Sequence, residues 1–299
     1  MSAARVLGDW GSTNLRLFRV QDGAVTARLD GPGTTALDGD AQGVLTERLK
    51  VWLAEGPVTD VTLCGMAGSP AGVVVAPYAP CPARLADWCN SVAEVIVAGV
   101  PVRVLPGLSH RDGSVPEVMR GEETQVFGAM ALDNGLASER HCIVLPGTHS
   151  KWVTIDQGRI AGFRTAPTGE IFALVAGQSS LTGTDMPGHG SFDEGFARGL
   201  ERAGEPVLGA MFEARAARML DGFSQDWAKG YLSGLLISSE VAQFSERAGP
   251  VTIVGAPALA ALYRKTLEAA GLVARIIDGD EAVLSGLMQT LEMEEGLQE

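Results

Sequence analysis

The feature that most constrains the fold is an order of strands and turns that occurs twice, about half a chain apart. In each copy a short apolar strand leads through a turn into two alternating strands joined by a second turn: residues 5–9, 15–20 and 24–29, then residues 141–145, 151–155 and 159–164. Alternation of apolar and polar residues is typical of half-buried strands. The repeat predicts an internally duplicated fold with an antiparallel meander at the start of each half.

Helices and further strands follow each copy, which predicts an α/β protein with mixed sheets flanked by helices. After the first copy the pattern predicts a helix over 41–54 and a strand over 58–64. After the second it predicts four helices (169–176, 191–203, 206–220 and 225–248), a strand over 251–255, a helix over 258–270, a strand over 273–277 and a last helix over 280–293. Trp227, Tyr231 and Leu235, with glycines between them, indicate close helix packing rather than a binding stripe.

The composition excludes several classes of protein. With 299 residues and 46% hydrophobic residues, the chain is long and apolar enough for a globular core. The net charge is −13 and no Lys/Arg cluster occurs, so we expect no nucleic-acid partner. No apolar run reaches the roughly 20 residues of a membrane span, and the first residues lack a secretory pattern. We therefore expect a cytoplasmic protein without a membrane partner. Neither the four cysteines nor the four histidines show metal-site spacing, so reduced, mostly buried thiols are expected.

The first turn, in the stretch Asp9 to Arg16, carries residues suited to a nucleotide. Gly11, Ser12, Thr13 and Asn14 can direct backbone N–H groups and hydroxyls toward phosphate oxygens. Asp9 ends a strand and is a candidate ligand of Mg²⁺. An ordinary hairpin with a surface aspartate is the alternative.

The second turn, Pro146 to Ser150, repeats this chemistry. Gly147 and Thr148 would donate to the outer phosphates of ATP, with Lys151 as a nearby positive charge. His149 could bind phosphate or substrate, or could serve only the turn. Two such hairpins suggest two lobes that hold one triphosphate. Late in the chain, Gly255 and Ala256 link a buried strand to a helix and are candidates for packing against adenine.

The chain resembles the 2-dehydro-3-deoxygalactonokinase family of the actin, heat-shock chaperone and sugar-kinase superfamily. The resemblance runs over most of the chain, and its most specific runs are Arg120-Gly-Glu-Glu-Thr-Gln125 and Pro146-Gly-Thr-His-Ser-Lys-Trp152. Further matching segments are Asp9–Arg16, Cys64–Ser69, Val75–Tyr78, Phe163–Thr165, Thr168–Glu170 and Leu232–Ile237. It departs at Gly255-Ala-Pro-Ala258, where relatives often have Gly-Thr-Ser, which leaves the adenine contacts less defined.

The resemblance implies a two-lobed actin-like ATPase fold, of the duplicated ribonuclease H-like type. The lobes would comprise residues 1–118 and 119–279, with the helix over 280–299 packed back on the first lobe. It also implies a kinase that uses ATP and Mg²⁺ to phosphorylate the terminal 6-hydroxyl of 2-dehydro-3-deoxy-D-galactonate in galactonate degradation.

The resemblance also implies a catalytic carboxylate at a helix start shortly before the second hairpin. Glu123, followed by Thr124, fits that position best, and the adjacent Glu122 is the alternative. A helix N-terminus favours the charged carboxylate, so an ionised group is expected at pH 7. Glu170 is a further source of a base if neither serves.

A sugar acid needs cations for its carboxylate, and Arg120 and Arg164 are the first candidates because a guanidinium can bind a carboxylate bidentately. Arg16 is another, unless it pairs with a carboxylate of its own hairpin. Ser69, which follows a buried strand, is a candidate donor to sugar hydroxyls, and His149 and Glu170 complete the candidate substrate-binding set.

Two other functions remain open at this point. One is a kinase of the same superfamily for another acidic or amino sugar, and the other is a non-kinase actin-like ATPase. The short chain argues against the second, because it leaves little room for partner-binding insertions. The sequence leaves the oligomeric state open, and a homo-oligomer is one of the options.

Overall fold

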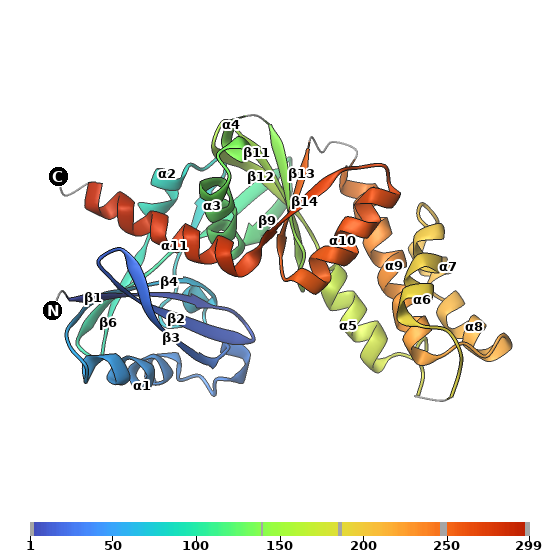
Figure 1. Cartoon of the computed structure of the whole chain (residues 1–299), viewed down its shortest axis with the longest axis horizontal. Helices are drawn as coiled ribbons and strands as arrows, with labels where there is room; N and C mark the ends of the chain where they lie inside the picture. Colours follow the sequence, from blue (N-terminus) through green and yellow to red (C-terminus); the bar gives the residue numbers. More distant parts are fainter. Residues whose placement is uncertain (1–2, 139, 185–186, 246–249, 297–299) are drawn as a thin grey trace. The chain divides into compact units, whose positions relative to one another are not determined.

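The structure is a computed structural model, and it describes residues 3–138, 140–184, 187–245 and 250–296. The chain divides into two compact units (Figure 1). Unit 1 contains residues 1–139, 155–163 and 279–299, and unit 2 contains residues 140–154 and 164–278. The sequence suggested a boundary after residue 118 and the last helix packed on the first lobe; the division places both residues 119–139 and the last helix in unit 1.

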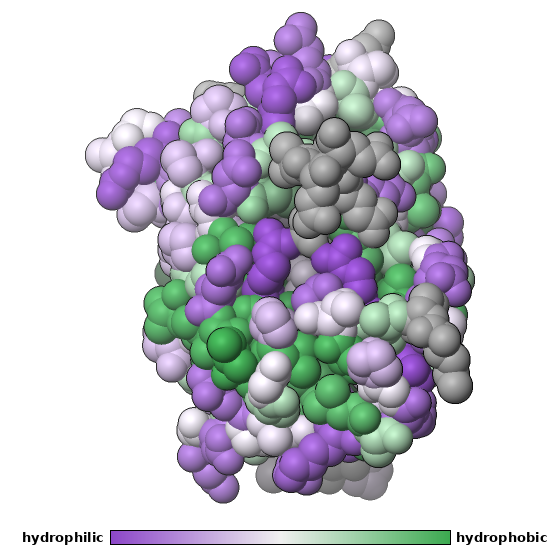
Figure 2. All heavy atoms as spheres, turned by 90° about the vertical axis from the view of Figure 1, so that its left-hand side faces the viewer, coloured by the Kyte–Doolittle hydropathy of each residue, from purple (hydrophilic) through white to green (hydrophobic). Residues whose placement is uncertain are grey.

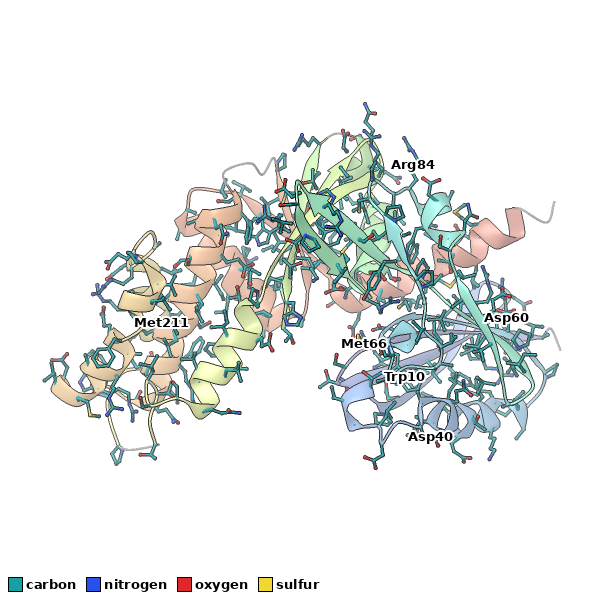
Figure 3. The ribbon with its side chains drawn as sticks, turned by 180° about the vertical axis from the view of Figure 1, so that it is seen from behind. Trp10, Asp40, Asp60, Met66, Arg84 and Met211 are labelled. Atoms are coloured by element: carbon teal, nitrogen blue, oxygen red, sulfur yellow. The ribbon has the colours of Figure 1, made fainter. Side chains whose placement is uncertain are left out.

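Unit 1 is built on a six-stranded mixed sheet in the order β3-β2-β1-β4-β7-β6. Its strands are β1 (Ala4–Trp10), β2 (Asn14–Gln21), β3 (Ala24–Pro32), β4 (Val58–Gly65), β6 (Ala93–Val97) and β7 (Val100–Val104). The first three form the predicted antiparallel meander, and β4 pairs in parallel with both β1 and β7. The carboxyl ends of β1 and β4 therefore lie side by side, at Trp10 and Met66 in Figure 3.

The two faces of this sheet are covered by different helices (Figure 1). On one face, α1 (Ala41–Leu53) buries Leu45, Leu49 and Trp52 against apolar side chains of the central strands. α11 (Gly279–Gly296) lies on the other side, where it contacts β1 and packs along α3 (Glu122–Leu132). The last helix of the chain thus packs against the sheet that the first strands of the chain form.

Unit 1 also contains elements that the sequence analysis did not identify. These are the β6–β7 hairpin, a small sheet of β5 (Tyr78–Pro80), β8 (Gly107–Asp112) and β9 (Val115–Met119), two 3₁₀ turns (Thr34–Ala36 and Met66–Gly68), and the short helices α2 (Leu85–Cys89) and α4 (Gly135–Ser138). They are three to six residues long, so each gives a periodicity analysis few positions to work with.

Unit 2 is built on a five-stranded sheet in the order β12-β11-β10-β13-β14. Its strands are β10 (His141–Leu145), β11 (Ser150–Asp156), β12 (Arg159–Ala166), β13 (Val251–Gly255) and β14 (Ala274–Asp278), and residues 155–163 of β11 and β12 group with unit 1. β10, β13 and β14 run parallel. The second copy of the strand pattern is therefore confirmed.

The helices of unit 2 surround a long central helix, α9 (Gln225–Phe244). The others are α5 (Thr168–Gln178), α6 (Phe192–Glu201), α7 (Val207–Ala210), α8 (Glu213–Leu220) and α10 (Pro257–Ala269). α6 crosses α9 so closely that a Cβ on Gly195 would lie 2.0 Å from the carbonyl oxygen of Trp227. Close packing around Trp227 and Tyr231 is thus confirmed. The expected single helix over 206–220 is two helices, and residues 246–248 of the expected 225–248 helix lie outside the described residues.

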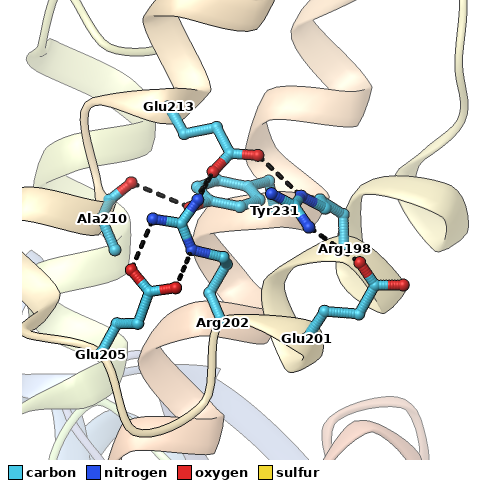
Figure 4. A network of polar contacts seen from close by, with 7 residues as sticks. All are labelled: Arg198, Glu201, Arg202, Glu205, Ala210, Glu213 and Tyr231. Carbon is cyan, nitrogen blue, oxygen red and sulfur yellow. Dashed lines mark hydrogen bonds and ion pairs between the residues drawn. The ribbon is translucent and has the colours of Figure 1, made fainter.

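A network of ion pairs joins α6 and α8 beside Tyr231, in the first half of α9 (Figure 4). Glu213 accepts hydrogen bonds from Arg198 and Arg202, and the buried Tyr231 hydroxyl donates to Glu213 at 3.2 Å and to the carbonyl oxygen of Ala210 at 2.9 Å. These contacts fix the helices to one another and involve no candidate site residue.

The surface is mixed in hydropathy. Figure 2 shows one face of the molecule on which hydrophilic side chains surround a band of apolar ones. Ile96, on the sheet-edge strand β6, is 71% exposed. Within the described residues, no helix combines the length and the apolar character that crossing a bilayer requires. All four cysteines are free thiols, with Cys64 and Cys142 buried.

Candidate active site

The strand register of unit 1 places Asp9 between two polar neighbours. Asp9 lies opposite Arg16 on β2 and opposite Cys64 on β4. Arg16 Nη2 donates to Asp9 Oδ2 at 2.6 Å, and Cys64 Sγ donates to Asp9 Oδ1 at 3.6 Å. Arg16 also pairs with Asp280 at the start of α11. The guanidinium that was a candidate for the substrate is therefore paired with two carboxylates, the alternative that the sequence left open.

The first turn lies beside these groups and is open to solvent. Gly11 N donates to the carbonyl oxygen of Asn14 at 2.8 Å, which closes the turn, and residues 12–14 are exposed. A pocket of about 460 Å³ is lined by Asp9, Gly11, Thr13, Asn14, Arg16, Arg28, Asp30 and Asp280. The pocket thus combines the turn with two cations and three carboxylates.

This arrangement fits Mg²⁺ in the form in which it accompanies a nucleotide. Within the described residues no three His, Cys, Asp or Glu side chains gather as a metal cage. Magnesium is usually held by one or two carboxylates, with phosphate oxygens and water completing its octahedron. Asp9 and Asp280 line the same pocket and can supply those carboxylates.

α3 begins against the end of β4. Gly121, which precedes the helix, has φ +110° and approaches Gly65, with φ +74°, so closely that a Cβ on Gly121 would lie 3.2 Å from Gly65 Cα. Glycine adopts such positive φ values without strain. Glu122 and Glu123 therefore occupy the first turn of α3, beside the end of β4, at a helix start as the resemblance implied.

The two glutamates differ in their surroundings. Glu123 is 1% exposed, and both its carboxylate oxygens accept from Gly121 N, at 2.7 and 2.9 Å. Burial, with a smaller contribution from the charge of Glu122, raises the pKa of Glu123 to about 8. The expectation of an ionised carboxylate at pH 7 is wrong for Glu123, because desolvation outweighs the helix terminus. Glu122 is half-buried, and its Oε2 accepts from Arg120 N at 3.0 Å.

Arg120 and Ser69 lie near one another, Arg120 just before α3 and Ser69 just after the 3₁₀ turn that follows β4. Arg120 Nη2 donates to the carbonyl oxygen of Ala76 at 2.8 Å, and the guanidinium carbon lies 4.2 Å from the ring centre of Tyr78. Its Nη1 would be 2.6 Å from a Cβ on Gly68, the residue before Ser69. Among the described residues, Arg120 Nη1 and Ser69 Oγ are buried and have no hydrogen-bond partner.

The second turn, in unit 2, lies between two other elements. A Cβ on Gly169, in the first turn of α5, would be 2.3 Å from the carbonyl oxygen of Gly147, and Glu170 N donates to the carbonyl oxygen of Thr148 at 2.9 Å. Gly147 itself faces open space on its Cα. The turn is thus backed by α5 and open on its other side.

The remaining candidates of unit 2 differ in their contacts. His149 Nε2 lies 2.8 Å from Glu170 Oε2, and both side chains are about half exposed. Lys151 is buried and its Nζ donates to Thr165 Oγ1 at 3.2 Å. The guanidinium of Arg164 lies 5.8 Å from the ring centre of Phe244.

The adenine candidates of unit 2 lie beside the start of the second turn. Gly255 lies beside Pro146, because β10 and β13 are neighbouring parallel strands, and Ala256 is exposed before α10. The neighbouring carboxyl ends of β10 and β13 therefore bring Gly255 close to the start of the turn that contains Gly147 and Thr148.

Sequence reasoning missed Cys64 and Asp280. The thiol of Cys64 is fully buried, and burial together with the charge of Asp9 raises its pKa, so that it stays a donor. Its place opposite Asp9 follows from the parallel pairing of β1 and β4 and could have been found from that pairing. Asp280 is 264 residues from Arg16, and no local pattern points to their contact.

Similarity to known proteins shows the family of this chain. The sequence matches the 2-keto-3-deoxy-galactonokinase family over residues 9–290. It is 37% identical to a probable 2-dehydro-3-deoxygalactonokinase of Rhizobium meliloti, over 93% of this chain and 94% of the relative, and 36% identical to the 2-dehydro-3-deoxygalactonokinase of Escherichia coli, over 96% and 97%.

Solved structures agree with this assignment. The crystal structure of a proposed 2-dehydro-3-deoxygalactonokinase from Sinorhizobium meliloti superposes with a TM-score of 0.84 at 34% identity, covering 98% of this chain and 96% of that one. Component A of the (R)-2-hydroxyglutaryl-CoA dehydratase of Acidaminococcus fermentans shares only the fold, with a TM-score of 0.51 at 12% identity over 98% and 99% of the two chains. The protein has the actin-like ATPase fold, and the chain belongs to the 2-keto-3-deoxy-galactonokinase family.

Proposed function

We propose that this protein transfers the γ-phosphoryl group of ATP to the terminal 6-hydroxyl of 2-dehydro-3-deoxy-D-galactonate, in the cytoplasm and as a step of galactonate degradation. The observation that carries the proposal is the pocket of unit 1, in which a phosphate-type turn adjoins Asp9, in a chain of this kinase family. Both relatives named above carry the name of this activity.

Each unit offers a turn suited to the phosphates of a nucleotide. Residues 11–14 of unit 1 are open to solvent, as are Gly147 and Thr148 of unit 2 on the side away from α5, and both turns can donate to phosphate oxygens. Lys151 adds positive charge, and Gly255 and Ala256 would pack against the adenine. Mg²⁺, held by Asp9, would neutralise charge on the phosphates during transfer.

The sugar acid would be held near Ser69 and Arg120. Buried donors without partners are rare in folded proteins, and Ser69 Oγ and Arg120 Nη1 are two such atoms close to one another. A carboxylate or hydroxyl of the substrate would satisfy them. Arg164, His149 and Glu170 are the candidates of unit 2 for further contacts, and Arg16 keeps a role through Asp9.

The chemical step requires a base for the substrate hydroxyl. The hydroxyl oxygen forms a bond to the γ-phosphorus as the bond to the bridging oxygen of ADP breaks, and the hydroxyl proton passes to a carboxylate. Glu123 is the proposed acceptor and Glu122 the alternative. A pKa of about 8 for Glu123 places its ionised form within reach near neutral pH.

The test is a coupled assay of ADP release over a panel of 2-keto-3-deoxy acids, hexoses and amino sugars. We expect ADP release that depends on 2-dehydro-3-deoxygalactonate, with the product phosphorylated at the 6-position by ³¹P NMR. Turnover that is unchanged when sugar is omitted would identify an ATPase instead. Efficient turnover of a neutral hexose or an amino sugar would identify another kinase of the superfamily.

A further inference from the structure

Glu240, on α9, is a buried carboxylate to which the proposed mechanism gives no role. It is 4% exposed, and each of its oxygens accepts a short hydrogen bond: Trp152 Nε1 donates to Oε1 at 2.7 Å, and the Tyr263 hydroxyl donates to Oε2 at 2.8 Å. A carboxylate is costly to bury, and cores of equal stability can be made from apolar residues. Stability alone therefore does not account for a glutamate at this place, and the positions of its hydrogen-bond partners indicate another role.

The partners of Glu240 flank the second turn. The Tyr263 hydroxyl lies 2.7 Å from Ser150 Oγ, and Ser150 is the first residue after the turn. The side chains of Ser150 and Thr168 also lower the pKa of Glu240 against the larger opposing effect of its burial, so both lie beside this carboxylate, and Thr168 is the first residue of α5. The chain thus enters β11 and α5 through residues that lie around one carboxylate.

These two anchoring points enclose Gly147 and Thr148. α5 contacts the turn directly, since a Cβ on Gly169 would lie 2.9 Å from Thr148 Cα. Moving either β11 or α5 relative to the other would therefore move the backbone of the turn. All of these residues belong to unit 2.

We propose that Glu240, through Tyr263 and Ser150, is a positioning residue that fixes the second turn in the conformation that binds the outer phosphates of ATP. This inference rests on the proposed role of Gly147 and Thr148. In this role the Glu240 carboxylate neither contacts the nucleotide nor takes part in the phosphoryl transfer.

Tyr231, on the same helix α9 as Glu240, offers a matched control for Tyr263 of α10. Tyr231 and Tyr263 are both fully buried, and each hydroxyl donates to a buried or half-buried glutamate. The hydroxyl of Tyr231 serves the α6–α8 network of Figure 4 and not the turn. Tyr263→Phe and Tyr231→Phe each remove one oxygen atom, so they separate loss of stability from loss of positioning.

The test compares the two variants in steady-state kinetics, urea unfolding and amide hydrogen exchange of the full chain. We expect similar losses of stability, but a rise of roughly 3- to 10-fold in KM for ATP only in Tyr263→Phe, the size expected for one hydrogen bond. KM for the sugar acid and competitive inhibition by AMP, which lacks the outer phosphates, should stay unchanged. Exchange at residues 147–149 should rise only in that variant.

Ser150→Ala gives a second, smaller change that removes only the last link of the network. It should reproduce the rise in KM for ATP, and Glu240→Gln should retain tighter ATP binding than Glu240→Leu, because an amide can still bond to Tyr263. Equal KM values and equal exchange at the turn in Tyr263→Phe and Tyr231→Phe would overturn the inference. A wild-type protein without sugar-dependent ATP turnover would instead refute the proposed function, and the exchange measurement would still decide the positioning role.

Discussion

Asp9 is the residue on which the proposed site in unit 1 would depend. Its carboxylate is held in place by Arg16 on one side and the Cys64 thiol on the other. Two neighbours that come from the strands on either side fix the rotamer of Asp9 through the sheet register, so the geometry does not rely on a flexible loop. Such fixed geometry is what a carboxylate beside a triphosphate requires.

Asp9→Asn is expected to lower kcat by at least about 10²-fold, because loss even of groups that only orient a metal ligand costs about 10- to 100-fold. Asp60→Asn is the matched control. Asp60, labelled in Figure 3, lies nearer the start of β4 and pairs with Arg5 at 2.9 Å. Its side chain is 21% exposed, against 16% for that of Asp9. Near-normal kcat in Asp9→Asn, with an intact fold, would remove Asp9 from the site.

Glu123 should make the stability of the protein depend on pH. Its pKa is about 8 in the folded protein and 4.5 in the reference state, so the folded state binds the extra proton between these values. The free energy of unfolding should therefore fall as pH rises from about 5 to about 8. In Glu123→Gln this part of the decline should be absent, so the variant should gain relative stability at pH 8. Urea unfolding at several pH values measures this, and parallel curves for the two proteins would contradict it.

The same residue should control the rate of transfer. Glu123→Gln is expected to lower kcat by roughly 10²-fold or more, as loss of a general base does, with little change in ATP binding. In the wild type, kcat/KM should rise with pH toward about 8. A large loss in Glu122→Gln alone would move the role to its neighbour, and no loss in either would leave Glu170 as the candidate.

At the scale of elements, the contact of α3 with α11 holds the candidate base in place. The two helices approach so closely that a Cβ on Gly128 would lie 1.8 Å from the carbonyl oxygen of Ala282, and one on Gly286 would lie 2.0 Å from that of Thr124. Thr124 follows Glu123 directly. The last helix of the chain is therefore needed for the position of the first turn of α3.

Gly128→Ala is expected to destabilise the protein by about 1–3 kcal/mol or more, because the helices must move apart to admit a methyl group. Gly177→Ala provides the opposite case. Gly177 lies in α5 with nothing within 4 Å of its added Cβ, so alanine there should stabilise by about 0.5–1 kcal/mol through its higher helix propensity. Urea unfolding of both variants checks this, and equal effects of one sign would contradict the packing argument.

The elements themselves were largely predictable, for a physical reason. Strands β1 to β4 and β10 to β14 alternate or are continuously apolar, and α10 begins at a proline, so local signals agreed with the fold. The β5–β8–β9 sheet was missed because its strands are short and partly exposed.

At the scale of the molecule, the site could be predicted only in part. The two turns were found because their residue types and the duplication pointed to phosphate. The pairing of Arg16 with Asp280 and the burial of Glu123 depend on which helix covers which strand, and no local pattern encodes that. The direction of the pKa shift of Glu123 was therefore wrong, although the residue itself lies where the resemblance implied.

The charge of the whole molecule bears on its substrate. A net charge of −13 repels an anion at long range, so a sugar acid must be bound by local cations. Arg120, with its buried Nη1, and Arg164 are the proposed cations. Removing one partner of a buried charged contact costs on the order of 2–5 kcal/mol. Arg120→Ala or Arg164→Ala should therefore impair the keto acid far more than a neutral substrate, and equal losses on both would assign these residues to phosphate or to structure.

The measurement that tests the account most directly is the ratio of kcat/KM for 2-dehydro-3-deoxygalactonate to kcat/KM for its neutral analogue without the carboxylate. For the wild type we predict a ratio of at least about 30, which corresponds to about 2 kcal/mol of carboxylate recognition. In Arg120→Ala or Arg164→Ala the ratio should fall toward one. A wild-type ratio near one would contradict the assignment of this protein as a sugar-acid kinase.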